Sequence, residues 1–277
     1  MLVSRYYLSD QERRLTAFDQ DTAIEQIAEN RFKGFVGNGW NIGDNPNGGY
    51  LLSLVSNAIG KVVAHPDPIS FTTHFLRPGL PGESCEIDVD VVRSGRTLTT
   101  VRATMIQADK PRLEVVAAYS NLAESAGLDG DITIDEPGFP SPEACVGRTG
   151  DMQGIDIALV EKLDIMLHPE QSEPGASGVA EISGWIRHSD LREPDSRSLL
   201  LFCDSFPPSP LGLLGYVGWV PTLELTVHVR RRPSPGWIKA RFRTDDLSRG
   251  RMIESGCLWD CTGALVAECR QVGLIRA

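Results

Sequence analysis

The chain reads GGYLLSLVSNAI from residue 48 to residue 59. This run is apolar on most faces of a helix, so it predicts a buried helix that ends near Gly60. Four segments rich in Val, Ile, Thr and Phe follow the helix and are typical of β-strands. They span residues 69–77, 84–93, 97–107 and 112–121.

The second half of the chain repeats this plan. A second apolar helix is expected at about 196–206, where Pro207 and Pro208 stop it. The stretch 226–233 resembles 73–78, because both run from a threonine through His and Arg to a proline. We therefore expect an internal duplication. The strands expected in this half span residues 161–167, 178–188, 222–231, 236–244, 251–260 and 264–275.

A long helix against a curved antiparallel sheet is the hotdog arrangement, which belongs to the α+β class. Two such units predict a double hotdog, with an N-terminal domain at 1–122 and a C-terminal domain at 155–277. The segment between them, 123–154, contains Gly and Pro throughout and has seven acidic residues against one basic residue. This composition predicts a mobile surface linker that buries little.

Composition narrows the class of protein. The 277 residues carry a formal net charge of −10, which argues against a nucleic-acid-binding protein. Residues 1–20 lack the apolar core of a secretory signal, and no run approaches the roughly 18 apolar residues of a membrane span. We therefore expect a cytoplasmic protein whose six scattered cysteines are free thiols.

Two polar residues stand in apolar surroundings. Asp204 follows the run Leu199–Cys203 and has no obvious solvated face, so it is a candidate functional carboxylate rather than a surface acid. Gln271 shares a strand face with Leu265, Ala267 and Cys269, although a core glutamine satisfied by backbone would fit the same pattern.

Thr222 opens a strand and alternates onto its polar face with Glu224, so the pattern alone indicates an ordinary strand threonine. The matching helix of the first half has Ser56 and Asn57 but no acid, which favours one active centre per chain. The motifs of serine hydrolases, P-loops and dinucleotide-binding folds are absent, and no cysteine or histidine spacing suggests a metal or a cofactor.

With these features in place, the chain resembles the acyl-CoA thioesterase II (TesB-like) family of the thioesterase-like superfamily, whose fold is a double hotdog. The resemblance extends over about residues 25–277 without the linker. It rests on the segments 47–50 (NGGY), 70–79 (SFTTHFLRPG), 92–96 (VRSGR), 185–187 (WIR), 222–224 (TLE) and 271–274 (QVGL), and on Asp204.

The resemblance implies hydrolysis of a fatty acyl-CoA to the free acid and CoA. In this family an Asp, a Thr and a Gln of the second half hold and activate the hydrolytic water, and Asp204, Thr222 and Gln271 match them. A buried aspartate would be a better base near neutral pH. A covalent acyl-enzyme through Asp204 is the alternative chemistry. Backbone N–H groups at the start of the first helix, at Gly48 and Gly49, are the candidate oxyanion donors.

The phosphates of CoA call for a basic surface. Residues 221–251 hold eight basic residues against three acidic ones, and Arg230 and Arg232 are candidate CoA contacts. A solvated strand face explains the same pattern equally well.

Other classes remain open. A non-catalytic acyl-CoA-binding or regulatory module would keep the fold without turnover. A hydratase or dehydratase would need a His–acid pair that the sequence does not offer convincingly. Exposed sheet edges make a homo-oligomer, either a dimer or a tetramer, possible.

Overall fold

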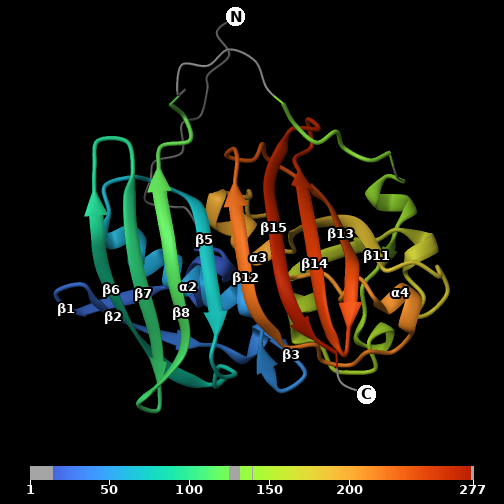
Figure 1. The fold of residues 1–277 in the computed structure, drawn as a ribbon, viewed down its shortest axis with the longest axis horizontal. Helices are drawn as coiled ribbons and strands as arrows, with labels where there is room; N and C mark the ends of the chain where they lie inside the picture. Colours follow the sequence, from blue (N-terminus) through green and yellow to red (C-terminus); the bar gives the residue numbers. More distant parts are fainter. Residues whose placement is uncertain (1–14, 125–131, 139, 276–277) are drawn as a thin grey trace, which may run out of the picture.

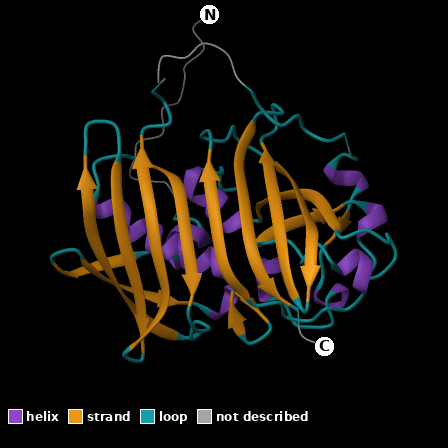
Figure 2. Cartoon of the chain, in the orientation of Figure 1, coloured by secondary structure: helices purple, strands orange, loops and turns teal. Residues whose placement is uncertain are grey.

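The computed structural model describes residues 15–124, 132–138 and 140–275. One 13-stranded antiparallel sheet runs through both halves, in the order β1-β2-β6-β7-β8-β5-β12-β15-β14-β13-β11-β10-β9. Figure 1 shows α2 and α3 on the same side of this sheet, and Figure 2 shows the strands as a continuous layer. Counted from the two outer edges of the sheet inward, the strands of each half follow one another in nearly the same order along the chain, and the last neighbours, β5 and β12, meet in the middle. This symmetry confirms the predicted duplication and the double hotdog.

The N-terminal half contains one long helix and six strands of the large sheet. Its elements are α1 (Ala17–Asp21), β1 (Ile24–Ala28), β2 (Arg31–Val36), η1 (Asn38–Trp40), β3 (Asn41–Ile42), β4 (Asn45–Pro46), α2 (Gly48–Val62), β5 (Asp67–Phe75), β6 (Glu83–Ser94), β7 (Thr99–Gln107) and β8 (Lys110–Ser120). The short β3 and β4 pair only with each other.

The C-terminal half mirrors this plan with shorter helices. Its elements are η2 (Pro142–Ala144), β9 (Val146–Gly147), η3 (Gly150–Met152), η4 (Ala158–Glu161), β10 (Leu163–Leu167), η5 (Pro169–Gln171), β11 (Glu181–His188), α3 (Ser196–Phe202), α4 (Leu211–Leu214), β12 (Thr222–Val229), β13 (Ile238–Ser248), β14 (Arg251–Trp259) and β15 (Leu265–Leu274).

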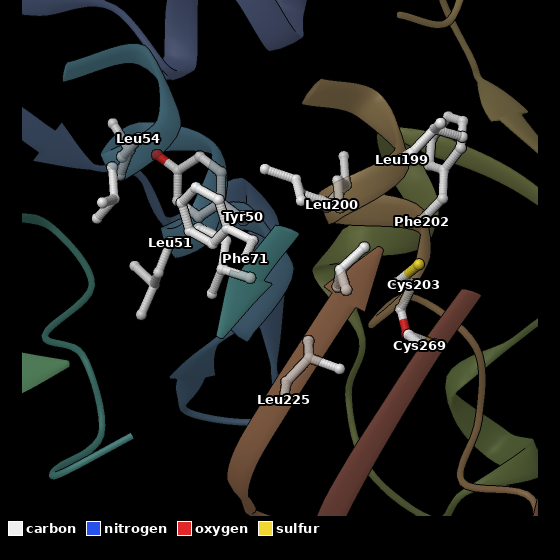
Figure 3. Packing of buried hydrophobic residues seen from close by; sticks show 14 of the residues in the cluster. Tyr50, Leu51, Leu54, Phe71, Leu199, Leu200, Phe202, Cys203, Leu225 and Cys269 are labelled. Atoms are coloured by element: carbon white, nitrogen blue, oxygen red, sulfur yellow. The ribbon is translucent and has the colours of Figure 1, made fainter. Parts of the chain in front are cut away.

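The two halves share one core. β5 pairs with β12 at their junction, where Thr73 lies opposite Leu225. Figure 3 shows core side chains of α2 and α3 above those of β5 and β12. At the crossing of the helices, a Cβ on Gly49 would lie 2.8 Å from the carbonyl oxygen of Leu201, so the close approach of α2 to α3 requires glycine.

Most predicted elements are confirmed, within a few residues at their ends. The prediction did not include β1, β2 or β9. The second helix was predicted to continue to residue 206 but ends at Phe202. In its last turn the Asp204 N–H bonds the Leu201 carbonyl at 3.1 Å, three residues back, and the Ser205 hydroxyl bonds the same carbonyl at 2.7 Å. Because these bonds replace the α-helical ones, the helix closes early.

The acidic segment was predicted to bury little, and most of its described residues are exposed, although parts of it contact the second half. The indole N–H groups of Trp185 and Trp259 donate to the carbonyls of Pro140 and Ile134, each at 2.8 Å. Further along the segment, Arg148 is buried, with only 5% of its surface exposed. The segment is therefore held against the second half by donors that the sheet presents. The domain limits 1–122, 123–154 and 155–277 stay a prediction.

Candidate functional site

A cavity of about 380 Å³ lies where the start of α2 meets the end of α3. This volume falls in the range of small-molecule sites, roughly 300–1,000 Å³. Its wall brings together four of the predicted site residues, which are Gly48, Asp204, Thr222 and Gln271. Apolar side chains complete much of the wall, among them Leu51, Phe75, Phe206, Trp219, Phe242 and Met252.

Asp204 is held by the other half of the chain. Its Oδ2 accepts hydrogen bonds from the Gly49 N–H at 2.9 Å and from Asn47 Nδ2 at 3.1 Å. Asn47 Nδ2 also donates to the Asp204 carbonyl at 2.6 Å. Asn47 is itself the N-cap of α2, and its Oδ1 accepts from the Tyr50 N–H at 2.9 Å. The carboxylate therefore lies at the positive end of the α2 dipole, where a negative charge is favoured.

The environment makes Asp204 a stronger base than an ordinary aspartate. Burial raises its pKa from 3.8 to about 6. The negative charge of the nearby Glu254 raises the pKa further. Hydrogen bonds from the Gly49 and Gly48 N–H groups and the positive charge of Arg148 lower it. A carboxylate with a pKa near 6 is ionised at neutral pH and binds a proton well enough for general-base catalysis.

The two glycines are required by the close packing around Asp204. A Cβ on Gly48 would lie 2.8 Å from Asp204 Oδ2 and 2.8 Å from the Phe75 ring. The N–H of Gly49, predicted as an oxyanion donor, points at the Asp204 carboxylate in this structure. Both glycines therefore position the carboxylate, and the oxyanion role of this backbone stays a prediction.

Thr222 and Gln271 form a hydrogen-bonded pair, with Thr222 Oγ1 donating to Gln271 Oε1 at 2.8 Å. Simple alternation along the strand puts Thr222 on the outer face with Glu224. A register shift between Thr222 and Glu224 changes its side, since a bulge adds one residue to the strand. Thr222 consequently faces the cavity.

Glu254 is a site residue that the sequence reasoning missed. It is 3% exposed, and its Oε1 accepts from Gln271 Nε2 at 2.5 Å. Its Oε2 accepts from the Ser209 N–H at 2.7 Å. Burial raises the pKa of Glu254, and the hydrogen bonds from Ser209 and Gln271 oppose the rise. The sequence did contain a signal for Glu254. At a spacing of two residues, Glu254 shares the inner face of β14 with Met252, Gly256 and Leu258, which makes it an acid on an otherwise apolar face.

Arg148 is the second site residue that sequence reasoning missed. Its guanidinium lines the cavity and donates to the Ser205 carbonyl and to Gln153 Oε1. Its Nε has no hydrogen-bond partner among the described residues. Burial lowers the pKa of Arg148 to about 9, and the charge of Asp204 opposes this. The sequence offered one signal for Arg148. It is the single basic residue of the segment 123–154, where every other charged residue is acidic.

The two predicted CoA contacts lie elsewhere. Arg230 and Arg232 follow the far end of β12, eight residues or more from Thr222. At about 3.3 Å per strand residue, this puts them more than about 25 Å along the strand from the cavity. Arg232 instead pairs with Asp67, with its Nη2 2.7 Å from Asp67 Oδ2. Neither arginine lines the cavity that holds Asp204, and their role as CoA contacts stays a prediction.

The first half has an equivalent set of positions with different residues. Ser56 lies nine residues beyond the N-cap Asn47, just as Asp204 lies nine beyond the N-cap Asp195. Tyr119 corresponds to Gln271, and its hydroxyl is 2.8 Å from Ser56 Oγ.

The register of the strands supports this equivalence. Tyr119 lies opposite Thr99 across β7 and β8, just as Gln271 lies opposite Glu254 across β14 and β15. The first half thus has hydroxyl groups where the second half has carboxyl groups, and those hydroxyls already have partners. A second cavity at this end is lined by Ser56 and Tyr119 and by the carboxyl groups of Asp19, Asp67 and Asp195. It has no carboxyl group at the positions equivalent to Asp204 and Glu254, which Ser56 and Thr99 occupy.

Two negative findings concern the described residues only. They contain no group of three or more His, Cys, Asp or Glu side chains arranged to hold a metal ion. None of their helices combines the length and the apolar character needed to cross a membrane.

Comparisons with known proteins identify the family of the two halves. The chain matches the family model of the acyl-CoA thioesterase N-terminal domain over residues 37–122 and that of the C-terminal domain over residues 142–275. Among curated proteins, an uncharacterized protein of Mycobacterium tuberculosis is 22% identical over 270 residues, covering 89% of this chain and 91% of that protein.

Solved structures share the complete architecture. A protein assigned as a thioesterase II from Thermobifida fusca YX has a TM-score of 0.84 and 28% identity, covering 95% of this chain and 98% of that one. The acyl-CoA thioesterase II TesB2 of Mycobacterium marinum has a TM-score of 0.71 and 20% identity, covering 94% and 98%. The two family models occupy the two halves of one sheet, and the chain therefore belongs to the acyl-CoA thioesterase II (TesB-like) family of double hotdog proteins.

Proposed function

We propose that this chain hydrolyses a fatty acyl-CoA to the free fatty acid and CoA, with Asp204 as the general base. One observation carries the proposal: a half-buried aspartate whose pKa is raised to about 6 shares a cavity with the hydrogen-bonded pair of Thr222 and Gln271. A raised carboxylate pKa beside polar groups that can orient a water is what thioester hydrolysis requires.

The proposed reaction proceeds in two steps. Thr222 and Gln271 orient a water, and Asp204 takes its proton as the oxygen attacks the thioester carbonyl carbon. The carbonyl electrons move onto its oxygen, and a tetrahedral intermediate forms. When this intermediate collapses, the C–S bond breaks. The CoA thiolate leaves and takes the proton that Asp204 had accepted. The products are a carboxylic acid and the CoA thiol, and Asp204 returns to its ionised form.

Asp204 has one free oxygen for catalysis. Its Oδ2 is held by Gly49 and Asn47, so Oδ1 is the oxygen left to take a proton from water or, in the alternative chemistry, to attack the thioester as a nucleophile. Hydrolysis of one equivalent of substrate in ¹⁸O-labelled water tests the covalent route. The general-base route gives acid in which every molecule carries one ¹⁸O from water and one unlabelled carbonyl oxygen. A mixed anhydride that water opens at the Asp204 carboxyl carbon instead gives unlabelled acid in the first turnover and leaves the label in Asp204.

Release of CoA from a panel of acyl-CoAs of different chain length tests the function. The released thiol is followed with a thiol reagent, and an enzyme-only trace is subtracted because Cys261 is exposed. We expect Asp204→Asn to lower kcat by about 10²–10⁴-fold, the usual contribution of a general base. Asp44→Asn, at an exposed aspartate, is the matched control.

The alternative of a non-catalytic module gives the opposite outcome. In that case acyl-CoA binds, as measured by calorimetry, but wild-type protein releases no thiol above the Asp204→Asn background. Such a result would overturn the proposed hydrolysis and leave the binding function.

A further inference from the structure

Glu254 has no role in the reaction written above, yet it is the most deeply enclosed acid of the cavity. It is 3% exposed, and none of the ion pairs among the described residues includes it. Both of its oxygens instead accept hydrogen bonds, from Gln271 Nε2 and from the backbone N–H of Ser209. An unpaired buried carboxylate costs several kcal/mol, so a site that keeps one has a use for it.

The position of Glu254 determines which way the Gln271 amide faces. The two residues lie directly opposite each other on β14 and β15. An ionised carboxylate only accepts hydrogen bonds, so Gln271 must present its NH₂ group to Glu254 and its carbonyl oxygen to Thr222. Thr222 must then donate its single hydroxyl proton to Gln271, as observed at 2.8 Å.

This direction has a consequence for the water. A hydroxyl that has donated its proton offers only lone pairs to a further partner. A water bound at Thr222 therefore donates one hydrogen to Thr222 and the other to Asp204. Both lone pairs of the water oxygen are then free of hydrogen bonds, and one of them can attack the thioester carbonyl. The opposite direction would make Thr222 donate to the water, which occupies one of the two lone pairs and leaves one O–H of the water without Thr222 as its acceptor.

We propose that Glu254 is a positioning residue that sets the direction of the hydrogen-bond chain through Gln271 to Thr222, and so orients the attacking water. This inference rests on the proposed hydrolysis and adds a residue to it. Glu254 acts through Gln271 and does not touch the substrate. A protonated Glu254 would have the donor pattern of a glutamine, and burial raises the pKa of Glu254. The inference therefore concerns the ionised form and is tested at the alkaline end of the pH range in which the protein stays folded.

Glu254→Gln reverses the chain while keeping the shape. The Ser209 N–H is a fixed donor, so the new amide must turn its oxygen to Ser209 and its NH₂ to residue 271. Gln271 then flips, and Thr222 becomes the acceptor. The double substitution Glu254→Gln with Gln271→Glu restores the original direction, because a carboxylate at 271 accepts from both neighbours.

We expect Glu254→Gln to lower kcat by about 10- to 100-fold with KM within about twofold, the size of effect that a misoriented reactant produces. The double substitution should recover most of that loss. In a Thr222→Val background, Glu254→Gln should cause little further loss, since residues that act through one another are not additive. An unchanged kcat in Glu254→Gln, or a double variant no more active than the single one, would overturn the inference.

A second measurement is independent of turnover. The side-chain NH₂ resonances of Gln271, assigned by their loss in Gln271→Glu, should include one proton strongly deshielded by the carboxylate, and Glu254→Gln should lack it. If wild-type protein hydrolyses no acyl-CoA but shows this proton, the proposed function fails, and only the direction of the hydrogen-bond chain from Glu254 through Gln271 is retained. If the proton is absent from wild-type protein, the orienting role fails whatever the turnover.

Discussion

The substitution Asp204→Asn should stabilise the protein while removing its activity. Both donors to the carboxylate, Gly49 N–H and Asn47 Nδ2, reach the same oxygen, Oδ2. An asparagine can place its carbonyl oxygen there and turn its NH₂ group to the cavity, so both hydrogen bonds survive. What disappears is the cost of a buried charge.

The magnitude follows from the pKa of Asp204. Its pKa rises from 3.8 to about 6 on folding, so the folded state binds the proton more tightly. Protonated Asp204 therefore carries no penalty below the unfolded pKa, and stability is lost as the pH rises from about 4 through 6. At about 1.4 kcal/mol per pH unit, the advantage of Asp204→Asn is about 1.5 kcal/mol at pH 5 and up to about 3 kcal/mol at pH 8.

Urea unfolding of both proteins at pH 5 and pH 8 measures this advantage, with refolding checked at each pH. The exposed Asp44→Asn is the control, and its effect should be small and equal at the two pH values. The reasoning is refuted if Asp204→Asn changes the free energy of unfolding by the same amount at pH 5 and pH 8. That result would mean that Asp204 titrates as an ordinary surface aspartate, and its assignment as the base would fail with it.

Three further predictions concern the same assays. First, kcat/KM should fall about tenfold per pH unit below about pH 6, because protonated Asp204 cannot accept a proton; a flat profile from pH 4.5 to 8 contradicts this. Second, Arg148→Met should move this acid limb to higher pH, since the guanidinium lowers the pKa of Asp204; an unmoved limb would show that its charge does not reach the base. Third, Tyr119→Phe should leave kcat within twofold and cost about 1 kcal/mol in urea unfolding, because it loses the bond to Ser56 at the other end of the fold; lowered activity would argue against a single active centre.

The parts of the fold that follow local rules could be predicted from sequence. The apolar run at α2 and the alternating strands of both halves give strong periodic signals, and the repeated order of features predicts the duplication. Asp204 and Gln271 were found because each breaks its local pattern. Thr222 was recognised only through the family resemblance, since a bulge reverses the face that alternation assigns to it.

The parts that depend on long-range contacts could not be predicted in this way. Arg148 comes from a segment whose composition indicates a surface linker, and only the packing of that segment brings the guanidinium to the cavity. Arg230 and Arg232 were predicted as CoA contacts from a local excess of positive charge, which does not indicate which end of a strand a site occupies, and both lie outside the cavity. The early end of α3 likewise depends on how the Ser205 hydroxyl and carbonyl find partners.

The proposed single active centre in a duplicated fold has a physical explanation. Asp204 is half-buried and Glu254 is buried, and a second pair of such acids at the equivalent end would add a similar cost of desolvation. That end has Ser56, Tyr119 and Thr99, whose neutral groups satisfy one another or their neighbours. In the proposed reaction the first half is still essential, because the N–H of Gly49 at the start of α2 holds the carboxylate of Asp204, which follows α3. Neither half can assemble the site alone, so separating the halves should abolish activity even where each piece folds.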